Sequence, residues 1–145
     1  MTDISKKQRW NHQTKFSFGA TSGIITNLAL IVGLDTLTHP RLSIIGGMLI
    51  IALADNISDS LGIHIYQESE CIRKKEVWFS TVTNFLTRLF VSLMFILLVA
   101  TLPINYAVIF SIICGLALLA GMSYIIAKNS GINPFLAIFE HISIA

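Results

Sequence analysis

Long apolar stretches alternate with short polar segments along the chain, and this pattern predicts membrane-spanning helices. Four stretches reach the roughly 20 residues that a hydrocarbon core of about 30 Å requires: residues 16–37, 43–66, 78–102 and 105–127. A fifth stretch, residues 134–145, falls short of the roughly 17 residues that a crossing needs. We expect it to re-enter the membrane, to lie in the interface, or to be a truncated fifth helix.

The predicted helices end where residues interrupt a helical backbone. Pro40 follows the first span, Pro103 follows the third, and Gly131 with Pro134 separates the fourth span from the tail. Proline lacks the backbone donor that a helix interior needs, and glycine tolerates the turn that closes a helix. The pattern therefore predicts an all-α protein, a polytopic transmembrane helix bundle with four full spans and a short fifth helix.

The composition supports a membrane protein and excludes several other classes. Of the 145 residues, 54% are hydrophobic and only 12% are charged, whereas a soluble domain has about 25% charged residues. So few charges cannot solvate the surface of a compact protein, and much of that surface must face lipid. A disordered chain, a nucleic-acid-binding module and a disulfide-rich secreted domain are all disfavoured. Accordingly, we expect a lipid bilayer as partner and no nucleic acid.

The sequence carries no recognised enzyme signature. It has no nucleophile with a matching base, no glycine-rich phosphate loop, and no Cys-x-x-Cys or His-Glu-x-x-His motif. Its two cysteines, Cys71 in a predicted loop and Cys114 within a predicted span, are not expected to pair. We therefore expect a protein that is not an enzyme and holds no structural cofactor.

The distribution of Lys and Arg predicts the orientation in the membrane. Cytoplasmic loops carry an excess of these residues, and with the N-terminus inside, Arg41 is the single outer cation. The inner side then holds eight: Lys6, Lys7, Arg9, Lys15, Arg73, Lys74, Lys75 and Lys128. We expect a cytoplasmic N-terminal segment (residues 1–15) and a transmembrane domain (residues 16–145), with the inner interface marked by Trp10, Tyr66 and Trp78. The short chain favours a prokaryotic plasma membrane.

Three ionisable side chains fall at mid-membrane depth. Each of Asp55, Asp59 and Arg88 costs roughly 2.5–3.5 kcal/mol at the centre of a membrane helix, and such residues are functional candidates by default. Asp55 and Asp59 are four residues apart and so share one helical face. The third span has a matching polar stripe, formed by Thr81, Asn84, Arg88 and Ser92.

The depth of each polar group follows from counting along its helix. Asn27 and Arg88 are predicted at the depth of Asp55, whereas Ser22 and Asn84 are predicted at the depth of Asp59. One cation facing two carboxylates leaves a surplus negative charge. Two interpretations remain open: a structural network in which Arg88 neutralises an aspartate, or a path for a cation or a proton.

The connection between the second and third spans, residues 67–77, contains Glu68, Glu70 and the cluster Arg73-Lys74-Lys75. It is either an amphipathic connector held at the anionic inner leaflet or an entrance where Glu68 and Glu70 capture a metal cation. His64 is five residues past Asp59, so a straight helix turns it off that face. We expect no metal site shared by these two residues.

Three segments carry a resemblance to a known family. Residues 19–33, GATSGIITNLALIVG, resemble the first helix of the vacuolar iron transporter family, which opens Gly-Ala-Asn-Asp-Gly. Residues 52–70 align with the second helix of the family, and residues 131–134, leading to Glu140 and His141, resemble the approach to its last helix. The resemblance implies a homodimeric five-helix membrane protein that moves Fe²⁺ or Mn²⁺ out of the cytoplasm by proton exchange.

The chain departs from the family pattern at its metal-binding positions. Ser22 stands where the family has its first-helix aspartate, and Ile57 and Leu61 stand at its second-helix methionine and glutamate. The glutamate-rich cytoplasmic insertion has no room in residues 67–77. We therefore interpret the chain as a divergent, short member of the family.

These observations lead to two functional hypotheses. In the first, the protein transports a divalent metal cation. Asp55 and Asp59 are then ligands or proton carriers, Arg88 sets the charge balance, and Asn27, Ser22 and Asn84 are neutral oxygen donors. In the second, the same bundle is a non-transporting membrane scaffold or interaction protein, whose polar centre fixes helix packing.

Overall fold

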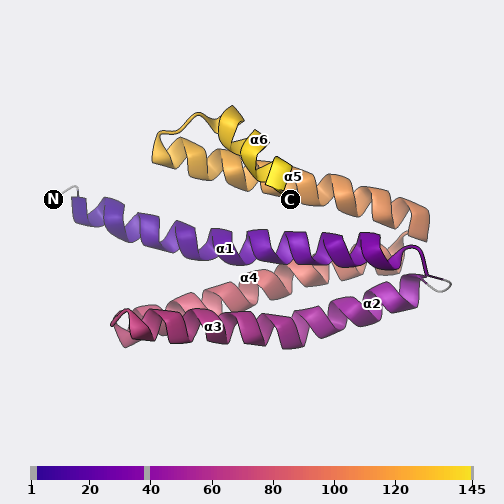
Figure 1. The fold of residues 1–145 in the computed structure, drawn as a ribbon, viewed down its shortest axis with the longest axis horizontal. Coiled ribbons are helices and arrows are strands. Elements are labelled where there is room, and N and C mark those ends of the chain that lie inside the picture. Colours follow the sequence, from indigo (N-terminus) through magenta and orange to yellow (C-terminus); the bar gives the residue numbers. More distant parts are fainter. Residues whose placement is uncertain (1–2, 38–39, 145) are drawn as a thin grey trace.

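The computed structural model describes residues 3–37 and 40–144, with side chains described from Phe18 onward. Over these residues the protein is all-helical (Figure 1), which confirms the predicted fold class. The elements are α1 (Asp3–Leu34), α2 (Pro40–Ile50), the π-helical η1 (Ile51–Asp55), α3 (Asn56–Ser69), α4 (Lys74–Thr101), α5 (Ile104–Ser130) and α6 (Pro134–Ile144).

Three of the described helices are long and apolar enough to cross a membrane, which indicates an integral membrane protein. They are Pro40–Ser69, in which α2, η1 and α3 run on without a break, Lys74–Thr101 and Ile104–Ser130. The sequence predicted four. In the first helix the described apolar part, Phe18–Leu34, counts only as a shorter apolar helix, as does Pro134–Ile144. The structure therefore supports a smaller number of full spans than the apolar pattern predicted.

The helix ends lie close to the predicted breaks. Pro40 begins α2, Pro103 precedes α5, and Pro134 begins α6, in agreement with the preference for proline at the start of a helix. Gly131 closes α5 in the left-handed conformation, with φ of 71°, which glycine adopts without steric penalty. The connections between the spans are consequently short.

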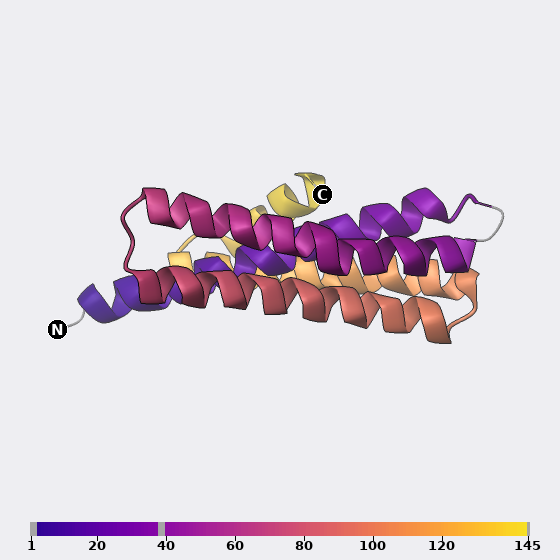
Figure 2. The same cartoon turned by 90° about the horizontal axis from the view of Figure 1, so that it is seen from below.

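The helices run roughly along one common axis (Figure 2), and α1 lies between two groups of helices. In Figure 1, α5 and α6 lie on one side of α1, whereas α4 and the α2–α3 helix lie on the other. Helix α1 packs mainly against α4 and, to a smaller extent, α5. The N-terminal end of α1 is at the same end of the bundle as the α3–α4 and α5–α6 connections. Helix α6 folds back along α5 (Figure 1).

The apolar core lies towards the end of the bundle that holds the α1–α2 and α4–α5 turns. Its fully buried side chains are Ile31, Ile44, Met48, Phe95, Val99 and Ala107. Small residues allow close helix contacts: a Cβ added at Gly47 would lie 2.8 Å from Leu30 Cδ1, and one at Gly115 would lie 2.5 Å from Leu28 Cδ1. Cys71 and Cys114 are both free.

Several predictions concern side chains outside the described residues. These are the N-terminal cations and one aromatic residue predicted at the inner interface: Lys6, Lys7, Arg9, Lys15 and Trp10. Helix α1 itself continues from Asp3 across residues 15 and 16. The division predicted there between a cytoplasmic segment and a membrane domain therefore does not coincide with a break in secondary structure.

Candidate functional site

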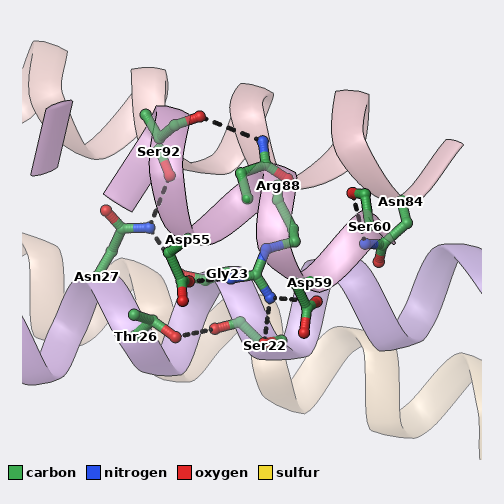
Figure 3. A network of polar contacts seen from close by, with 12 residues as sticks. Ser22, Gly23, Thr26, Asn27, Asp55, Asp59, Ser60, Asn84, Arg88 and Ser92 are labelled. Atoms are coloured by element: carbon green, nitrogen blue, oxygen red, sulfur yellow. Dashed lines mark hydrogen bonds and ion pairs between the residues drawn. The ribbon is translucent and has the colours of Figure 1, made fainter. Parts of the chain in front are cut away.

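Arg88 is the centre of a polar network that joins three helices (Figure 3). Its side chain is only 3% exposed, and it extends from α4 towards η1, α3 and α1. Nη2 donates to Asp55 Oδ2, and Nη1 donates to Asp59 Oδ2 at 2.8 Å and also to Ser22 Oγ. A guanidinium is a planar fork with several donors, which suits it to holding two carboxylates at once. The network therefore fixes the position of both aspartates relative to α1 and α4.

The two carboxylates lie at the open side of this network. The side chain of Asp55 is 48% exposed and that of Asp59 is 31% exposed, although both meet the buried Arg88. Each uses Oδ2 for Arg88, so its Oδ1 atom is outside these contacts. At formal charges the two carboxylates and one guanidinium sum to −1. The arrangement thus presents negative charge and free carboxylate oxygens on the surface of an apolar helix.

Asn27 belongs to a separate contact between α1 and α4. Its Nδ2 donates to Gly23 O at 2.7 Å and to Ser92 Oγ at 2.9 Å, and its side chain is fully buried. Its Oδ1 is buried without a hydrogen-bond partner. The sequence predicted Asn27 as an oxygen donor at the depth of Asp55, whereas its amide nitrogen donates to Ser92 and to the backbone of Gly23. Asn27 therefore ties the two helices together.

Asn84 likewise contacts a hydroxyl rather than an aspartate. Its Nδ2 donates to Ser60 Oγ at 3.1 Å, which joins α4 to α3. Its Oδ1 is buried without a hydrogen-bond partner and packs on Gly19 of α1, where an added Cβ would lie 2.5 Å from it. Figure 3 shows this pair to one side of the Arg88 network. Of the predicted site residues, Asp55, Asp59, Arg88 and Ser22 come together, and the two asparagines flank them.

The π-helical turn that ends at Asp55 is a feature that the sequence analysis missed. Asn56 follows this turn, and its Nδ2 donates to Ala52 O at 3.3 Å and to Phe85 O of α4 at 3.0 Å. π-Helical turns occur frequently at functional sites. The positions that this helix buries lie at a constant spacing of four: Ile44, Met48, Ala52, Asn56 and Ser60.

This spacing does not fit a straight α-helix. Each step of four residues turns about 400°, so the stripe drifts by about 40° per step and by about 160° over four steps. A π-helical turn holds more residues per turn and takes up part of this drift. It therefore keeps the polar residues of α3 in contact with α4.

A groove of about 410 Å³ lies on the other side of Ser22, among α1, α5 and α6. It is lined mainly by apolar residues, with Ser22, Ser123 and His141 among the polar ones. His141 Nδ1 is 2.8 Å from Ser123 Oγ, so α6 brings this residue back onto α5. Glu140, next to it, is exposed. Ser22 thus belongs to the Arg88 network and also lines the groove that holds the Ser123–His141 pair.

The two glutamates predicted to capture a cation do not converge. Glu68 is exposed and its Oε1 lies 3.5 Å from His64 Nε2, whereas Glu70 caps the end of α3. His64 faces α4, with Nδ1 2.9 Å from Thr81 Oγ1. Arg73 pairs with Glu76 at the start of α4. Within the described part of the chain, no group of three or more His, Cys, Asp or Glu side chains is placed to hold a metal ion.

Comparison with known proteins assigns no relative to this arrangement. No protein-family model matches the chain, and no curated protein or solved structure matches it.

Proposed function

We propose that the protein is an integral membrane transporter of divalent metal cations, Fe²⁺ or Mn²⁺, of the vacuolar iron transporter type. One observation carries this proposal: a single buried guanidinium, that of Arg88, faces two carboxylates that remain partly exposed. An ionised group within an apolar span is expensive and commonly marks an ion pathway. The surplus charge of Asp55 and Asp59 calls for a cation or a proton.

Asp55 and Asp59 are the proposed ligands. Carboxylate oxygens bind Mn²⁺ and Fe²⁺ well, and each aspartate holds Arg88 by Oδ2 alone. A cation that approaches the Oδ1 atoms meets a group with a formal charge of −1. A proton neutralises the same surplus, so exchange of metal for protons is the proposed coupling. Arg88 keeps the empty site from carrying two uncompensated negative charges.

Neutral groups around the network have supporting roles. Ser22 Oγ accepts from Arg88 and also lines the groove of about 410 Å³, so it is the proposed neutral oxygen donor on the access route. Asn27 and Asn84 were predicted as further oxygen donors. Their amide groups bond to Ser92 and Ser60, and we now assign them the role of holding α1 and α3 against α4.

The proposal includes α1 as a fourth span. The helix has 32 residues, which corresponds to about 48 Å at roughly 1.5 Å per residue, more than the approximately 30 Å of a hydrocarbon core. Its N-terminal end lies at the same end of the bundle as the connection that leads into α4 (Figure 1), where the sequence has Arg73, Lys74 and Lys75. By the excess of Lys and Arg in cytoplasmic loops, we assign this end to the cytoplasm. A homodimer in a prokaryotic plasma membrane completes the proposal.

A non-transporting scaffold is the second candidate, and the hydrogen bonds between helices favour it. Arg88 already contacts both carboxylates, and Asn27–Ser92 and Asn84–Ser60 join α1 and α3 to α4. Hydrogen bonds of this kind hold membrane helices together, at about 0.6 kcal/mol each on average. On this alternative, the polar centre specifies the packing and moves no ion.

Uptake of Mn²⁺ into proteoliposomes under a proton gradient separates the two functions. The transporter is expected to move Mn²⁺ in the wild type, and Asp55→Asn and Asp59→Asn are each expected to lower the rate at least tenfold. Asp35→Asn is the matched control, because this carboxylate lies beyond the end of α1 and outside the network. An inactive wild type, or loss of folding in both network variants, would support the scaffold.

A further inference from the structure

His64 occupies a defined place between α3 and α4, away from the Arg88 network. Nδ1 lies 2.9 Å from Thr81 Oγ1, and the imidazole meets the ring of Trp78 edge-on, with centroids 4.8 Å apart. An open groove of about 330 Å³ is lined by these three residues together with apolar side chains of both helices. The side chain of His64 is 14% exposed, so it is held in place and still accessible.

The hydrogen bonds of Thr81 determine which nitrogen of His64 carries the proton. Thr81 Oγ1 donates its hydrogen to Val77 O, at 2.9 Å. A hydroxyl has one hydrogen to donate, so towards His64 it acts as the acceptor, and Nδ1–H is the donor. The neutral imidazole therefore keeps its lone pair on Nε2. In metal sites, the same kind of bond at the second nitrogen fixes the tautomer and orients the ring.

A carboxylate lies close to Nε2 of His64. Glu68 is one turn further along α3, and its Oε1 is 3.5 Å from His64 Nε2. A divalent ion such as Zn²⁺ binds imidazole nitrogen and carboxylate oxygen at about 2.0–2.2 Å, and a tetrahedral angle then separates the two donor atoms by about 3.4 Å. The observed separation of the two donor atoms, 3.5 Å, is close to this value.

We propose that His64 and Glu68 form a two-ligand binding site for a divalent transition metal at this end of α3. The side chain of Glu68 is 54% exposed, so water completes the coordination. One imidazole with one carboxylate suits Zn²⁺, Co²⁺ or Fe²⁺ and is unlike the all-oxygen sites of Ca²⁺ and Mg²⁺. The proposal does not depend on transport through Asp55 and Asp59, because neither of these residues is a ligand of the proposed site.

The site also revises the predicted capture pair. Glu68 and Glu70 are two residues apart, and residues at this spacing do not face each other on a helix. Glu70, moreover, lies at the cap where α3 ends. His64 replaces Glu70 as the second ligand, because a spacing of four residues puts His64 on the same helical face as Glu68.

Trp78 provides a direct measurement of metal binding. In the full-length protein carrying Trp10→Phe, purified in detergent without a histidine tag, Trp78 is the remaining tryptophan. Co²⁺ bound to His64 is expected to quench its fluorescence in a saturable manner, and Zn²⁺ is expected to compete. His64→Gln should abolish the saturable phase, Glu68→Gln should weaken binding at least tenfold, and Glu70→Gln should leave it unchanged.

Thr81 tests the tautomer argument separately. Loss of such a supporting hydrogen bond typically lowers metal affinity 10–100-fold, so Thr81→Val should weaken Co²⁺ binding by that factor, whereas Thr81→Ser should restore it. Circular dichroism verifies that each variant is folded. The proposal fails if the wild type shows no saturable quenching, if His64→Gln or Glu68→Gln binds Co²⁺ as the wild type does, or if Glu70→Gln weakens binding as much as Glu68→Gln does. Equal affinities of Thr81→Val and Thr81→Ser would overturn the role of the Nδ1 bond.

Discussion

Replacing Arg88 by Met removes the guanidinium and keeps a long unbranched side chain in the same buried position. Asp55 and Asp59 then remain on one face of the helix without their cation. Each carboxylate accepts one hydrogen bond from Arg88, and a bond to a charged group contributes about 1.5–3 kcal/mol. Two such bonds give about 3–6 kcal/mol, in line with the approximately 3–5 kcal/mol lost when one partner of a buried ion pair is removed.

The free energy of unfolding can be measured by circular dichroism, with increasing SDS in dodecyl maltoside micelles. Arg88→Met is expected to lose about 3–5 kcal/mol. Lys128→Met is the matched control, because it removes an exposed cation at the end of α5 whose contact is the ring of Tyr124, and it should change stability by no more than about 1 kcal/mol.

A neutralised triple variant distinguishes lost charge balance from lost packing. Arg88→Met combined with Asp55→Asn and Asp59→Asn has no charge left in the network. Replacing a whole buried ionic group by neutral residues is often close to neutral in stability. Most of the stability lost in Arg88→Met should therefore return. A single variant as stable as the wild type would refute this reasoning, and so would a triple variant no more stable than the single one.

Three further predictions concern packing and topology. Gly19→Ala places a Cβ 2.5 Å from Asn84 Oδ1 and should lower the unfolding free energy by about 1–3 kcal/mol. Gly62→Ala is the control, because Gly62 has open space around it and this change should leave the unfolding free energy the same. Equal effects of the two changes would refute the close contact. Ser60→Ala leaves the buried Nδ2 of Asn84 without its acceptor and should lower the unfolding free energy by about 1–3 kcal/mol in the same assay. An unchanged unfolding free energy would contradict this bond. Cys71, exposed in the α3–α4 connection, should react with a membrane-impermeant maleimide only from the cytoplasmic side, and labelling of intact cells would reverse the proposed orientation.

The helical fold was largely predictable because chain-breaking residues and apolar length act locally. Pro40, Pro134 and Gly131 mark helix ends in the sequence and in the structure. The number of full spans was less predictable. The described apolar part of α1, Phe18–Leu34, is shorter than a full span, whereas the helix itself continues back to Asp3.

The charged centre of the site was predictable, but the partners of the asparagines were not. Depth along each helix placed Asp55, Asp59 and Arg88 at neighbouring levels, and their opposite charges determined the pairing. Depth does not give the rotation of one helix against another. Asn27 and Asn84 therefore reached the expected level but turned towards hydroxyls on the adjacent helix.

The central claim is that the carboxylates of the Arg88 network carry the cation. The most direct measurement is Mn²⁺ uptake by proteoliposomes that contain the neutralised triple variant, compared with wild type at equal amounts of folded protein. This variant is expected to keep its fold while it lacks both carboxylates, so failure to fold cannot account for the result. The proposed transporter predicts rapid uptake by the wild type and none above empty liposomes for the variant. Equal uptake by the two proteins would contradict the claim.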